Sequence, residues 1–257
     1  MARKILVTGG TGLLGRKLIS NSDIDFVKVG SEIDLLADGG PRLIVELAKR
    51  HGCETLLHLA WKSNSVPDYD KSLENSQWVS ISIQIARECV ENGISFVGLG
   101  TGLEVDFSIH SEYVQSKREL RELLQKEIGP ENMSWIRPFY IFDIHERRPR
   151  IVEALFKQSA LDPLVIRFGS SEIDYISSID VANGIMQSIS ANLRGTIDIG
   201  SGCLITNRVF VNAVCNNEGV KIPLILDASS GTPSSANVKS LISLGWSPTH
   251  TSRYLSL

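Results

Sequence analysis

The stretch Thr8-Gly9-Gly10-Thr11-Gly12-Leu13-Leu14-Gly15 leads from a short apolar run directly into a helical pattern. Each glycine meets a separate steric need. Gly9 allows the tight turn from strand to helix, Gly12 lets the backbone approach a pyrophosphate, and Gly15 lets the helix pack closely on the sheet. The N–H groups at the start of the helix then face the phosphates. In this strand–turn–helix context the stretch predicts a dinucleotide-binding turn.

Strands and helices alternate through the first two-thirds of the chain. Apolar or β-branched runs predict strands at Lys4–Thr8, Asp25–Val29, Thr55–Leu59, Ser95–Leu99 and Ser134–Arg137. Helical patterns lie between them at Gly12–Ser20, Pro41–His51, Leu73–Glu91 and Ser111–Ile128. This alternation is typical of βαβ units, so we expect an α/β fold with a Rossmann-type, doubly wound parallel sheet.

From about Pro149 onward the segments are shorter, and glycine, serine and proline are denser. Thr196–Ile199 is the one later run that we expect to return to the main sheet. The sequence therefore predicts an NAD(P)-binding Rossmann domain at 1–148. A smaller, substrate-binding C-terminal cap follows at 149–257. Ligands of open α/β sheets bind beyond the carboxyl ends of the strands, where such a cap would lie.

Composition excludes several classes of protein. The 257 residues carry a net charge of -3, so no excess of positive charge points to nucleic acid or to anionic lipid. No apolar run approaches the roughly 20 residues of a membrane helix. The four cysteines have no C-x-x-C spacing and are expected to be reduced core thiols, and we expect no metal site. These features favour a cytoplasmic protein without a nucleic-acid or membrane partner.

The end of the second predicted strand bears on the choice of cofactor. An acidic residue usually holds the adenosine ribose at this place, but Phe26–Ser31 contains none, and Lys28 and Ser31 lie there instead. Without a carboxylate, nothing repels a 2′-phosphate. The cofactor is therefore NADP or NAD, with NADP favoured, and Asp34 and Leu35 are expected near the adenine.

Tyr113 and Lys117 are four residues apart in a predicted helix and thus lie on one face, one turn apart. A tyrosine hydroxyl has an unperturbed pKa of about 10. A neighbouring ammonium favours the phenolate and lowers that pKa. The pair therefore suits proton transfer in a carbonyl/alcohol couple.

These motifs together resemble the extended short-chain dehydrogenase/reductases, NAD(P)-dependent enzymes that modify nucleotide-linked sugars. Residues 8–15 are similar to the family's T-G-x-x-G-x-x-G, and His58-Leu59-Ala60-Trp61 to its H-x-A-A segment. Asn75 matches a helix asparagine, and Tyr113 and Lys117 match the catalytic pair.

The resemblance continues through the second half of the chain. Arg137–Phe142 is similar to the R-x-x-N-x-Y-G stretch beside the nicotinamide. Asp174–Ala182 is similar to the R-D-F-x-x-V-x-D-V-A segment, and Leu244–Pro248 resembles the late L-G-W-x-P. Ile173 replaces the customary arginine before Asp174, so the diphosphate would need another cation, for which Arg147, Arg148, Arg150 and Arg167 are the candidates.

The resemblance implies a catalytic triad of Thr101, Tyr113 and Lys117, in which Thr101 is the only hydroxyl available after the predicted strand Ser95–Leu99. An alternative role for Thr101 is to cap the turn. The residues expected to contact the substrate are Thr101, Gly102 and Tyr140. The residues expected to contact the cofactor are Gly9, Thr11, Gly12, Leu13, Leu14, Gly15, Lys28, Ser31, Asp34, Leu35, Leu59, Ala60, Trp61, Asn75, Leu99, Tyr113, Lys117, Pro138, Phe139 and Tyr140.

Departures from the family narrow the reaction. Gly102 and Leu103 replace the Asp-Glu of the 4,6-dehydratases, and Leu103 replaces the cysteine of the epimerase-reductases. Hydride transfer with Tyr113 as the acid remains. We therefore expect an NAD(P)H-dependent reductase of a nucleotide-linked 4-keto-6-deoxy-sugar. An NAD-dependent nucleotide-sugar 4-epimerase and a non-catalytic NAD(P)-binding redox sensor are the alternatives.

Relatives of this fold commonly form homodimers through two long helices, here Leu73–Glu91 and Ser111–Ile128. We expect a homodimer in which Ile81, Ile85, Val114 and Leu120 contribute to the contact.

Overall fold

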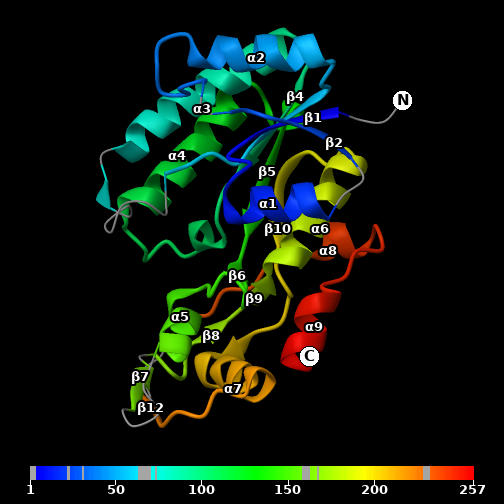
Figure 1. The fold of residues 1–257 in the computed structure, drawn as a ribbon. Coiled ribbons are helices and arrows are strands. Elements are labelled where there is room, and N and C mark those ends of the chain that lie inside the picture. The colour runs from blue at the N-terminus through cyan, green and yellow to red at the C-terminus, as the bar shows by residue number, and fades with distance from the viewer. Residues whose placement is uncertain are drawn as a thin grey trace. The chain divides into compact units, whose positions relative to one another are not determined.

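A computed structural model describes residues 4–21, 24–30, 32–62, 71–72, 74–157, 163–166, 168–227 and 232–257 (Figure 1). The chain forms two compact units. The first comprises Met1–Arg137 together with Ser188–Ile197, and the second comprises Pro138–Gln187 and Asp198–Leu257. The cofactor-binding domain at 1–148 and the substrate-binding domain at 149–257 were defined by function rather than by compactness, and they stay a prediction.

The first unit is built on a six-stranded sheet with the order β10-β5-β4-β3-β1-β2. Each neighbouring pair from β5 to β2 is parallel. The strands are β1 (Lys4–Thr8), β2 (Asp25–Lys28), β3 (Thr55–His58), β4 (Ser95–Leu99), β5 (Met133–Pro138) and β10 (Gly195–Ile199). The predicted doubly wound sheet is confirmed, including the return of the late strand β10.

Helices connect these strands, and most bounds lie within one residue of the prediction. They are α1 (Leu13–Ser20), α2 (Gly40–His51), α3 (Glu74–Glu91), η2 (Gly102–Val105), α4 (Glu112–Glu127) and η3 (Pro130–Asn132). Pro41 lies in the first turn of α2, where its missing N–H costs no hydrogen bond. Gly52 at φ +68° ends α2, and its N–H donates to the carbonyls of Ala48 and Lys49.

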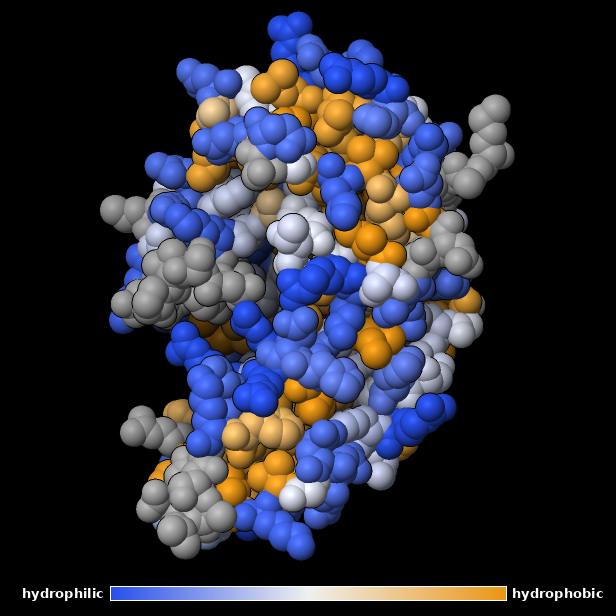
Figure 2. Space-filling view, in the orientation of Figure 1, coloured by the Kyte–Doolittle hydropathy of each residue, from blue (hydrophilic) through white to orange (hydrophobic). Residues whose placement is uncertain are grey.

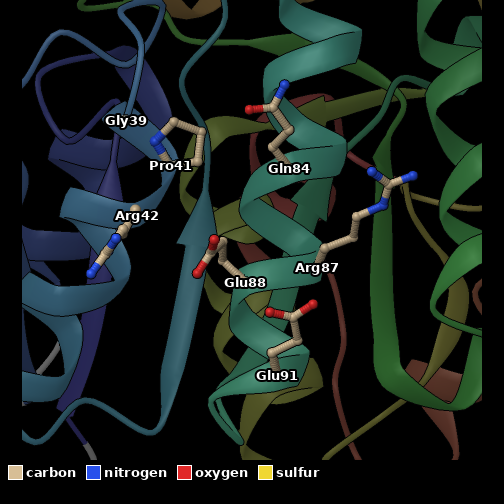
Figure 3. Close-up of a pocket in the computed structure, with 7 residues that line it drawn as sticks. All are labelled: Gly39, Pro41, Arg42, Gln84, Arg87, Glu88 and Glu91. Atoms are coloured by element: carbon tan, nitrogen blue, oxygen red, sulfur yellow. The ribbon is translucent and has the colours of Figure 1, made fainter.

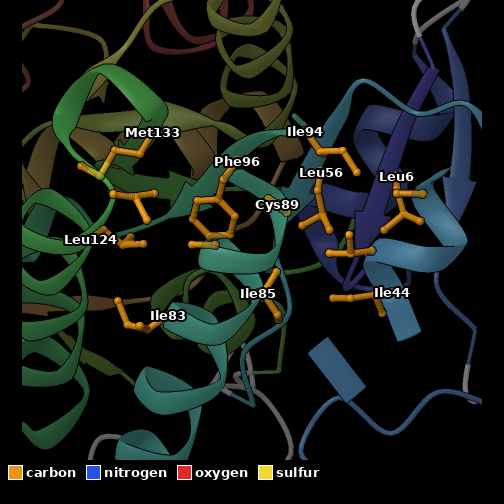
Figure 4. Close-up of a cluster of buried hydrophobic side chains, with 14 of the residues drawn as sticks. Leu6, Ile44, Leu56, Ile83, Ile85, Cys89, Ile94, Phe96, Leu124 and Met133 are labelled. Atoms are coloured by element: carbon orange, nitrogen blue, oxygen red, sulfur yellow. The ribbon is translucent and has the colours of Figure 1, made fainter. Parts of the chain in front are cut away.

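Alternate strand residues point to opposite faces of the sheet. Leu6, Leu56 and Phe96 face α2, α3 and α4 and pack with Ile85 and Leu124 in one buried cluster (Figure 4). Helix α1 covers the other face (Figure 1). Both faces are thus buried, which explains why the strands are continuous apolar runs rather than alternating ones.

The order of the sheet places its switch point between β1 and β3. Strand β1 has β2 on one side and β3 on the other, so the chain winds in both directions from β1. Ligands of such sheets bind outside the carboxyl ends of the strands at this point. The residues that follow β1 and β3, Gly9 and Leu59 among them, are therefore the natural place for a ligand.

The second unit contains short elements around its own core. They are β6 (Tyr140–Phe142), α5 (Arg150–Lys157), β7 (Leu164–Ile166), β8 (Glu172–Ile173), β9 (Tyr175–Ser177), β11 (Ile205–Thr206), α7 (Asn207–Glu218), β12 (Leu224–Leu226), α8 (Lys239–Ile242) and α9 (Thr249–Leu255). Helix α6 (Ser178–Ser190) leads the chain toward β10. The rings of Tyr175 and Phe210 stack at 3.8 Å between centroids, and the Tyr175 hydroxyl donates to Asn207 Oδ1 at 2.6 Å.

A buried carboxylate, that of Asp174, connects the loops of this second unit. Asp174 is 1% exposed, and its Oδ1 accepts from the N–H and the hydroxyl of Ser201. Its Oδ2 accepts from the N–H groups of Gly202 and Ala236. A Cβ on Gly200 would lie 2.7 Å from the same Oδ2, so this turn needs a glycine. One carboxylate therefore fixes two loops that are far apart in the sequence.

Two expectations about side chains are wrong. Ile85, Val114 and Leu120 are buried in the core of their own chain, so they are not available for the expected dimer contact. On the face shown in Figure 2, apolar residues lie among hydrophilic ones, and the exposed large apolar side chains described for the first unit are Leu43, Val90 and Phe107. Among the cysteines, Cys53 and Cys89 are buried as expected, but Cys203 is exposed and Cys215 only half-buried.

Candidate active site at the carboxyl edge of the sheet

The glycine loop has the geometry of a phosphate-binding turn. Gly9 has φ +70°, and a Cβ there would lie 2.7 Å from the backbone nitrogen of Ala60. A Cβ on Gly15 would lie 2.5 Å from the Gly9 carbonyl oxygen, so α1 packs directly on the loop. At Gly12, the N-cap of α1, an added Cβ meets only the Gly9 oxygen, at 3.2 Å. The loop therefore leaves backbone N–H groups and the positive end of the helix dipole open to an anion.

Two cations accompany this loop. Arg16, which the sequence reasoning missed, donates from its guanidinium to the carbonyl oxygen of Thr11. Lys28 is exposed, and its Cγ lies 3.3 Å from the position of a Cβ on Gly10. Arg16 follows the last loop glycine directly, and this spacing was the signal that could have found it. Both cations add to the anion-binding character of the turn.

The end of β2 also carries an acidic residue that the sequence reasoning left out. A Cβ on Gly30 would lie 2.0 Å from Glu32 Oε2, so the Glu32 carboxylate folds back over Gly30. Asp34 is exposed, and its Oδ1 accepts from the N–H of Leu36 at 3.0 Å. Ser31, the other residue predicted here, lies outside the described residues. The sequence argument for NADP assumed that no carboxylate stands at this place, and Glu32 weakens it.

His58 ends β3 as a neutral, buried histidine. Its Nδ1 lies 2.8 Å from the hydroxyl oxygen of Thr8, and its Nε2 lies 3.0 Å from that of Ser82. Burial, with a smaller contribution from the charge of Lys117, lowers the pKa of His58 to about 3. His58 is therefore a packed, hydrogen-bonded histidine. The Thr8 hydroxyl oxygen also accepts from the N–H of Ala60, which joins the residues after β1 and β3.

Trp61 is held from two sides. Its indole N–H donates to Asn75 Oδ1 at 2.8 Å, and Asn75, which is 3% exposed, donates in turn to the carbonyl of Ser72. The ring stacks on Trp78 with 6.0 Å between centroids. Asn75 and Trp61 were both predicted near the cofactor, and the structure brings them into direct contact.

Lys117 is a buried ammonium below this indole. It is 4% exposed, and its Nζ donates to the carbonyl of Leu99 at 2.7 Å and lies 3.5 Å from the centroid of the Trp61 ring. Burial lowers the pKa of Lys117 to about 7, and the negative charge of Glu104 opposes this shift. Strongly shifted pKa values cluster at functional sites, so Lys117 at the edge of the sheet is a candidate functional residue.

Tyr113 lies one turn before Lys117 in α4, as predicted from the spacing. Ser111 is the N-cap of this helix, and its Oγ accepts from the N–H of Val114 at 3.3 Å. The Tyr113 ring contacts Trp61 edge-on with 6.2 Å between centroids, and the Lys117 Nζ lies 5.8 Å from its centroid. The tyrosine and the lysine therefore share one side of α4 and both contact the same indole.

Thr101 caps the short helix η2, which is the alternative role that the sequence left open. Its Oγ accepts from the N–H of Leu103 at 3.3 Å, and Glu104 Oε1 accepts from the N–H of Thr101 at 2.9 Å. This is a capping box. A threonine hydroxyl that accepts one hydrogen bond still has its proton to donate, so capping leaves the catalytic role open.

Glu104 explains why this turn is rigid. The carboxylate is 2% exposed and accepts from the indole N–H of Trp135 and, at 3.1 Å, from the Arg121 guanidinium. Burial raises the pKa of Glu104, and its hydrogen bonds and the two arginines Arg121 and Arg137 oppose that rise. Its carboxylate is thus engaged in structure, in agreement with the absence of dehydratase residues after Thr101.

Three predicted cofactor residues belong to the second unit. The Phe139 N–H donates to the Ile199 carbonyl and the Tyr140 N–H to the Asp174 carbonyl. Tyr140 is 40% exposed and contacts Tyr175 edge-on, whereas Pro138 and Phe139 are buried. Arg147, Arg148 and Arg150 are exposed, and Arg167 lies outside the described residues.

A surface pocket of about 370 Å³ lies elsewhere in the first unit (Figure 3). It is lined by Gly39, Pro41, Arg42, Gln84, Arg87, Glu88 and Glu91, none of which is a predicted site residue. Arg87 is paired with Glu127 at 2.6 Å and Arg42 with Glu46 at 3.0 Å, so its cations have partners. In the described part of the chain no group of His, Cys, Asp and Glu could hold a metal ion, and no helix is long and apolar enough to cross a membrane.

Solved structures share this fold. A GDP-mannoheptose C4 reductase from Campylobacter jejuni with NADP bound is 15% identical, with a TM-score of 0.76 over 96% of this chain and 93% of that one. A dTDP-4-dehydrorhamnose reductase from Yersinia enterocolitica is 19% identical, with a TM-score of 0.73 over 99% of both chains. A UDP-glucose 4-epimerase from Thermus thermophilus in complex with NAD is 18% identical, with a TM-score of 0.70 over 95% of this chain and 94% of that one.

These likenesses define the class of fold: a Rossmann-type α/β fold shared with reductases and epimerases of nucleotide-linked sugars. The fold implied by the resemblance to the extended short-chain dehydrogenase/reductases is thereby confirmed. No family model and no curated protein sequence matches the chain.

Proposed function

We propose that the protein is an extended short-chain dehydrogenase/reductase that reduces a nucleotide-linked 4-keto-6-deoxy-sugar with NAD(P)H. The observation that carries the proposal is the buried Lys117 ammonium one turn below Tyr113, at the edge of the sheet that also carries the glycine loop. The structural likeness to nucleotide-sugar reductases supports the substrate class.

The residues present fit a nicotinamide dinucleotide. The first turn of α1 offers its N–H groups to the pyrophosphate, with Arg16 beside them, and Gly12 lets the phosphate approach without a side chain in the way. Lys117 lies at the carboxyl end of β4, where it would hold the nicotinamide ribose through its ammonium. When bound, the reduced nicotinamide supplies a hydride to the carbonyl carbon of the sugar.

The side chains of the protein then position the carbonyl oxygen of the sugar and supply the proton that it receives. Thr101 donates its hydroxyl proton in a hydrogen bond to the carbonyl oxygen and so positions it. Tyr113 donates its proton to the same oxygen as the alkoxide forms, because a neighbouring ammonium favours the phenolate that remains. Because the pKa of Lys117 is lowered to about 7, about half of the molecules carry a protonated Lys117 near neutral pH. Turnover should therefore depend on pH in this range.

The test is the oxidation of NADPH and NADH in the presence of nucleotide-linked 4-keto-6-deoxy-sugars, followed by the absorbance of the reduced nicotinamide. We expect turnover with one sugar, and a loss of about a hundredfold or more in Tyr113→Phe with the cofactor affinity retained. Tyr254→Phe, whose hydroxyl contacts Glu218 in the second unit, is the matched control. Cofactor binding without turnover on any sugar would instead support the redox sensor.

The same assay decides between the two coenzymes. Lys28 and Arg16 favour a 2′-phosphate through their charge, whereas the Glu32 carboxylate over Gly30 opposes it. We propose NADP as the preferred cofactor on the balance of two cations against one anion. Glu32→Gln should then raise the preference for NADPH further.

A 4-epimerase is the second candidate, and the likeness to a UDP-glucose 4-epimerase in complex with NAD favours it. Such an enzyme would use Thr101, Tyr113 and Lys117 in both directions and would retain its cofactor. Release of NAD from the denatured protein, together with no net oxidation of NAD(P)H, would support the epimerase over the reductase.

We also propose a cytoplasmic homodimer that uses α3 and α4. The residues on the outer side of these helices are mainly polar, among them Gln84, Glu112 and Glu119, so the contact would be a polar one. Light scattering should give a mass twice the 28.2 kDa of one chain. A mass of a single chain at micromolar concentration would contradict the dimer.

A further inference from the structure

Trp61 follows the strand that lies between β1, which precedes the glycine loop, and β4, whose last residue binds Lys117. The loop follows β1, Trp61 lies shortly after β3, and Lys117 binds the last residue of β4, with β3 between the other two strands. A dinucleotide that lies on the loop and reaches Lys117 must therefore pass the end of β3. The Trp61 side chain is thus on the path of the cofactor that the proposed function requires.

The indole is not loose in this position. Its N–H donates to Asn75, one face stacks on Trp78, and the ring meets Tyr113 edge-on. Asn75 is itself buried and bound to the carbonyl of Ser72. The contacts come from the two helices α3 and α4, so they hold the ring in one orientation.

In this orientation the indole covers the lysine. The Lys117 Nζ lies 3.5 Å from the ring centroid, a close cation–π contact, while another of its protons goes to the Leu99 carbonyl. An ammonium has three protons to donate. A ribose with two hydroxyls cannot take its usual share of this ammonium while the π face and the carbonyl both occupy it.

We propose that Trp61 is a positioning residue that covers Lys117 and must release it when the nicotinamide ribose binds. The inference rests on the proposed function, since it is the cofactor that competes with the indole. Trp61 thereby adds a cost to cofactor binding and keeps the ammonium in place beside Tyr113 until the ribose arrives.

A competing side chain has an unusual signature, because its removal tightens binding. A desolvated cation–π contact corresponds to about two- to thirtyfold in an equilibrium constant. Trp61→Ala should therefore bind NADPH and NADH about two- to thirtyfold more tightly in calorimetric titration. Trp61→Phe keeps a smaller π face but loses the bond to Asn75, so its affinity should lie between the two. Trp246→Phe, a buried tryptophan of the second unit, is the control and should bind as the parent does.

A second measurement follows cofactor binding in the parent protein, and the Trp61→Phe variant serves only to assign the resonance. In protein labelled with 5-fluorotryptophan, the fluorine resonance of Trp61 is identified as the one missing from Trp61→Phe. Addition of NADPH or NADH should move this resonance strongly, since the ring leaves the ammonium, and should leave the Trp246 resonance in place.

The outcomes separate the two proposals. The proposal that Trp61 covers Lys117 is overturned if the cofactor binds but the Trp61 resonance does not move, or if Trp61→Ala binds more weakly than the parent. In either case the proposed function stands. If neither the parent nor Trp61→Ala binds NADPH or NADH, both proposals fall together. Tighter binding in Trp61→Ala with a shifted Trp61 resonance in the parent supports the cover.

Discussion

Each unit of the molecule buries a charged side chain, and the two units treat it differently. In the second unit, the Asp174 carboxylate accepts four hydrogen bonds from Ser201, Gly202 and Ala236. In the first unit, the Lys117 ammonium has one carbonyl, that of Leu99, and the face of an indole. Both groups are almost fully buried.

The difference lies in how the surroundings of each group act on its charged form. Burial raises the pKa of Asp174, and all four hydrogen bonds oppose that rise, so its surroundings are built to keep the carboxylate. The surroundings of Lys117 leave its pKa lowered to about 7. A charge that is saturated by backbone and hydroxyl donors holds loops together, whereas one with weak partners keeps its capacity for a ligand.

The largest effect on stability should follow from Asp174→Asn. The amide keeps the shape but turns an N–H₂ toward two of the four donors, which leaves buried donors unpaired. We expect the free energy of unfolding to fall by about 4 kcal/mol, measured by urea unfolding. Glu172→Gln, on the exposed side of β8 in the same segment, should change it by less than about 0.5 kcal/mol. Equal effects of the two substitutions would contradict the structural role of Asp174.

An intermediate effect should come from His58 and should depend on pH. Its folded pKa of about 3 lies below the unfolded value of about 6.5, so the unfolded chain takes up the proton first. The stability that this histidine contributes is present above pH 6.5 and is lost as the pH falls toward 3. Between pH 7 and pH 4 the loss should be about 3 kcal/mol.

His58→Asn is the comparison for this pH dependence, because it keeps a polar group near Thr8 but does not titrate. The variant should be less stable than the parent at pH 7, and its stability should fall less steeply between pH 7 and pH 4. Parallel curves for the two proteins would show that another group carries the acid sensitivity.

Lys117→Met should have the smallest effect on stability and the clearest one on function. Replacing a buried charge with an apolar side chain of similar length is often close to neutral, so we expect the free energy of unfolding to change by no more than about 1 kcal/mol. Turnover in the reductase assay should fall about a hundredfold. Lys126→Met, on the exposed side of the same helix, should change neither quantity. A large loss of stability in Lys117→Met would make this lysine a structural charge like Asp174.

The sequence predicts the first unit well because its signals are local. The glycine loop, Pro41 at the start of α2 and the four-residue spacing of Tyr113 and Lys117 all act within a few residues. Buried parallel strands are apolar on both faces, so their runs are easy to recognise. The return of β10 to the sheet also follows from a short β-branched run.

The remaining parts depend on contacts between distant residues. Glu104 is structural because Trp135 and Arg121 reach it, and no local pattern indicates this. The indole over Lys117 joins a residue that follows β3 to a residue of α4. Ile85, Val114 and Leu120 were expected in a dimer contact, but α3 and α4 pack against each other and the sheet, which buries these side chains.

The return of β10 sets an order on the synthesis of this protein. The Ser134 hydroxyl donates to the Leu193 carbonyl at 2.6 Å, and the Arg194 guanidinium donates to Ser95 Oγ. The edge of the sheet beside β5 is therefore completed by residues that follow α6 in the chain. As the nascent chain leaves the ribosome, the edge of β5 stays unpaired until the first part of the second unit, Pro138–Gln187, has been translated. An unpaired strand edge invites pairing with other chains. During its synthesis the protein thus exposes the unpaired edge of β5 for a time, and chaperone binding would be most useful in that period.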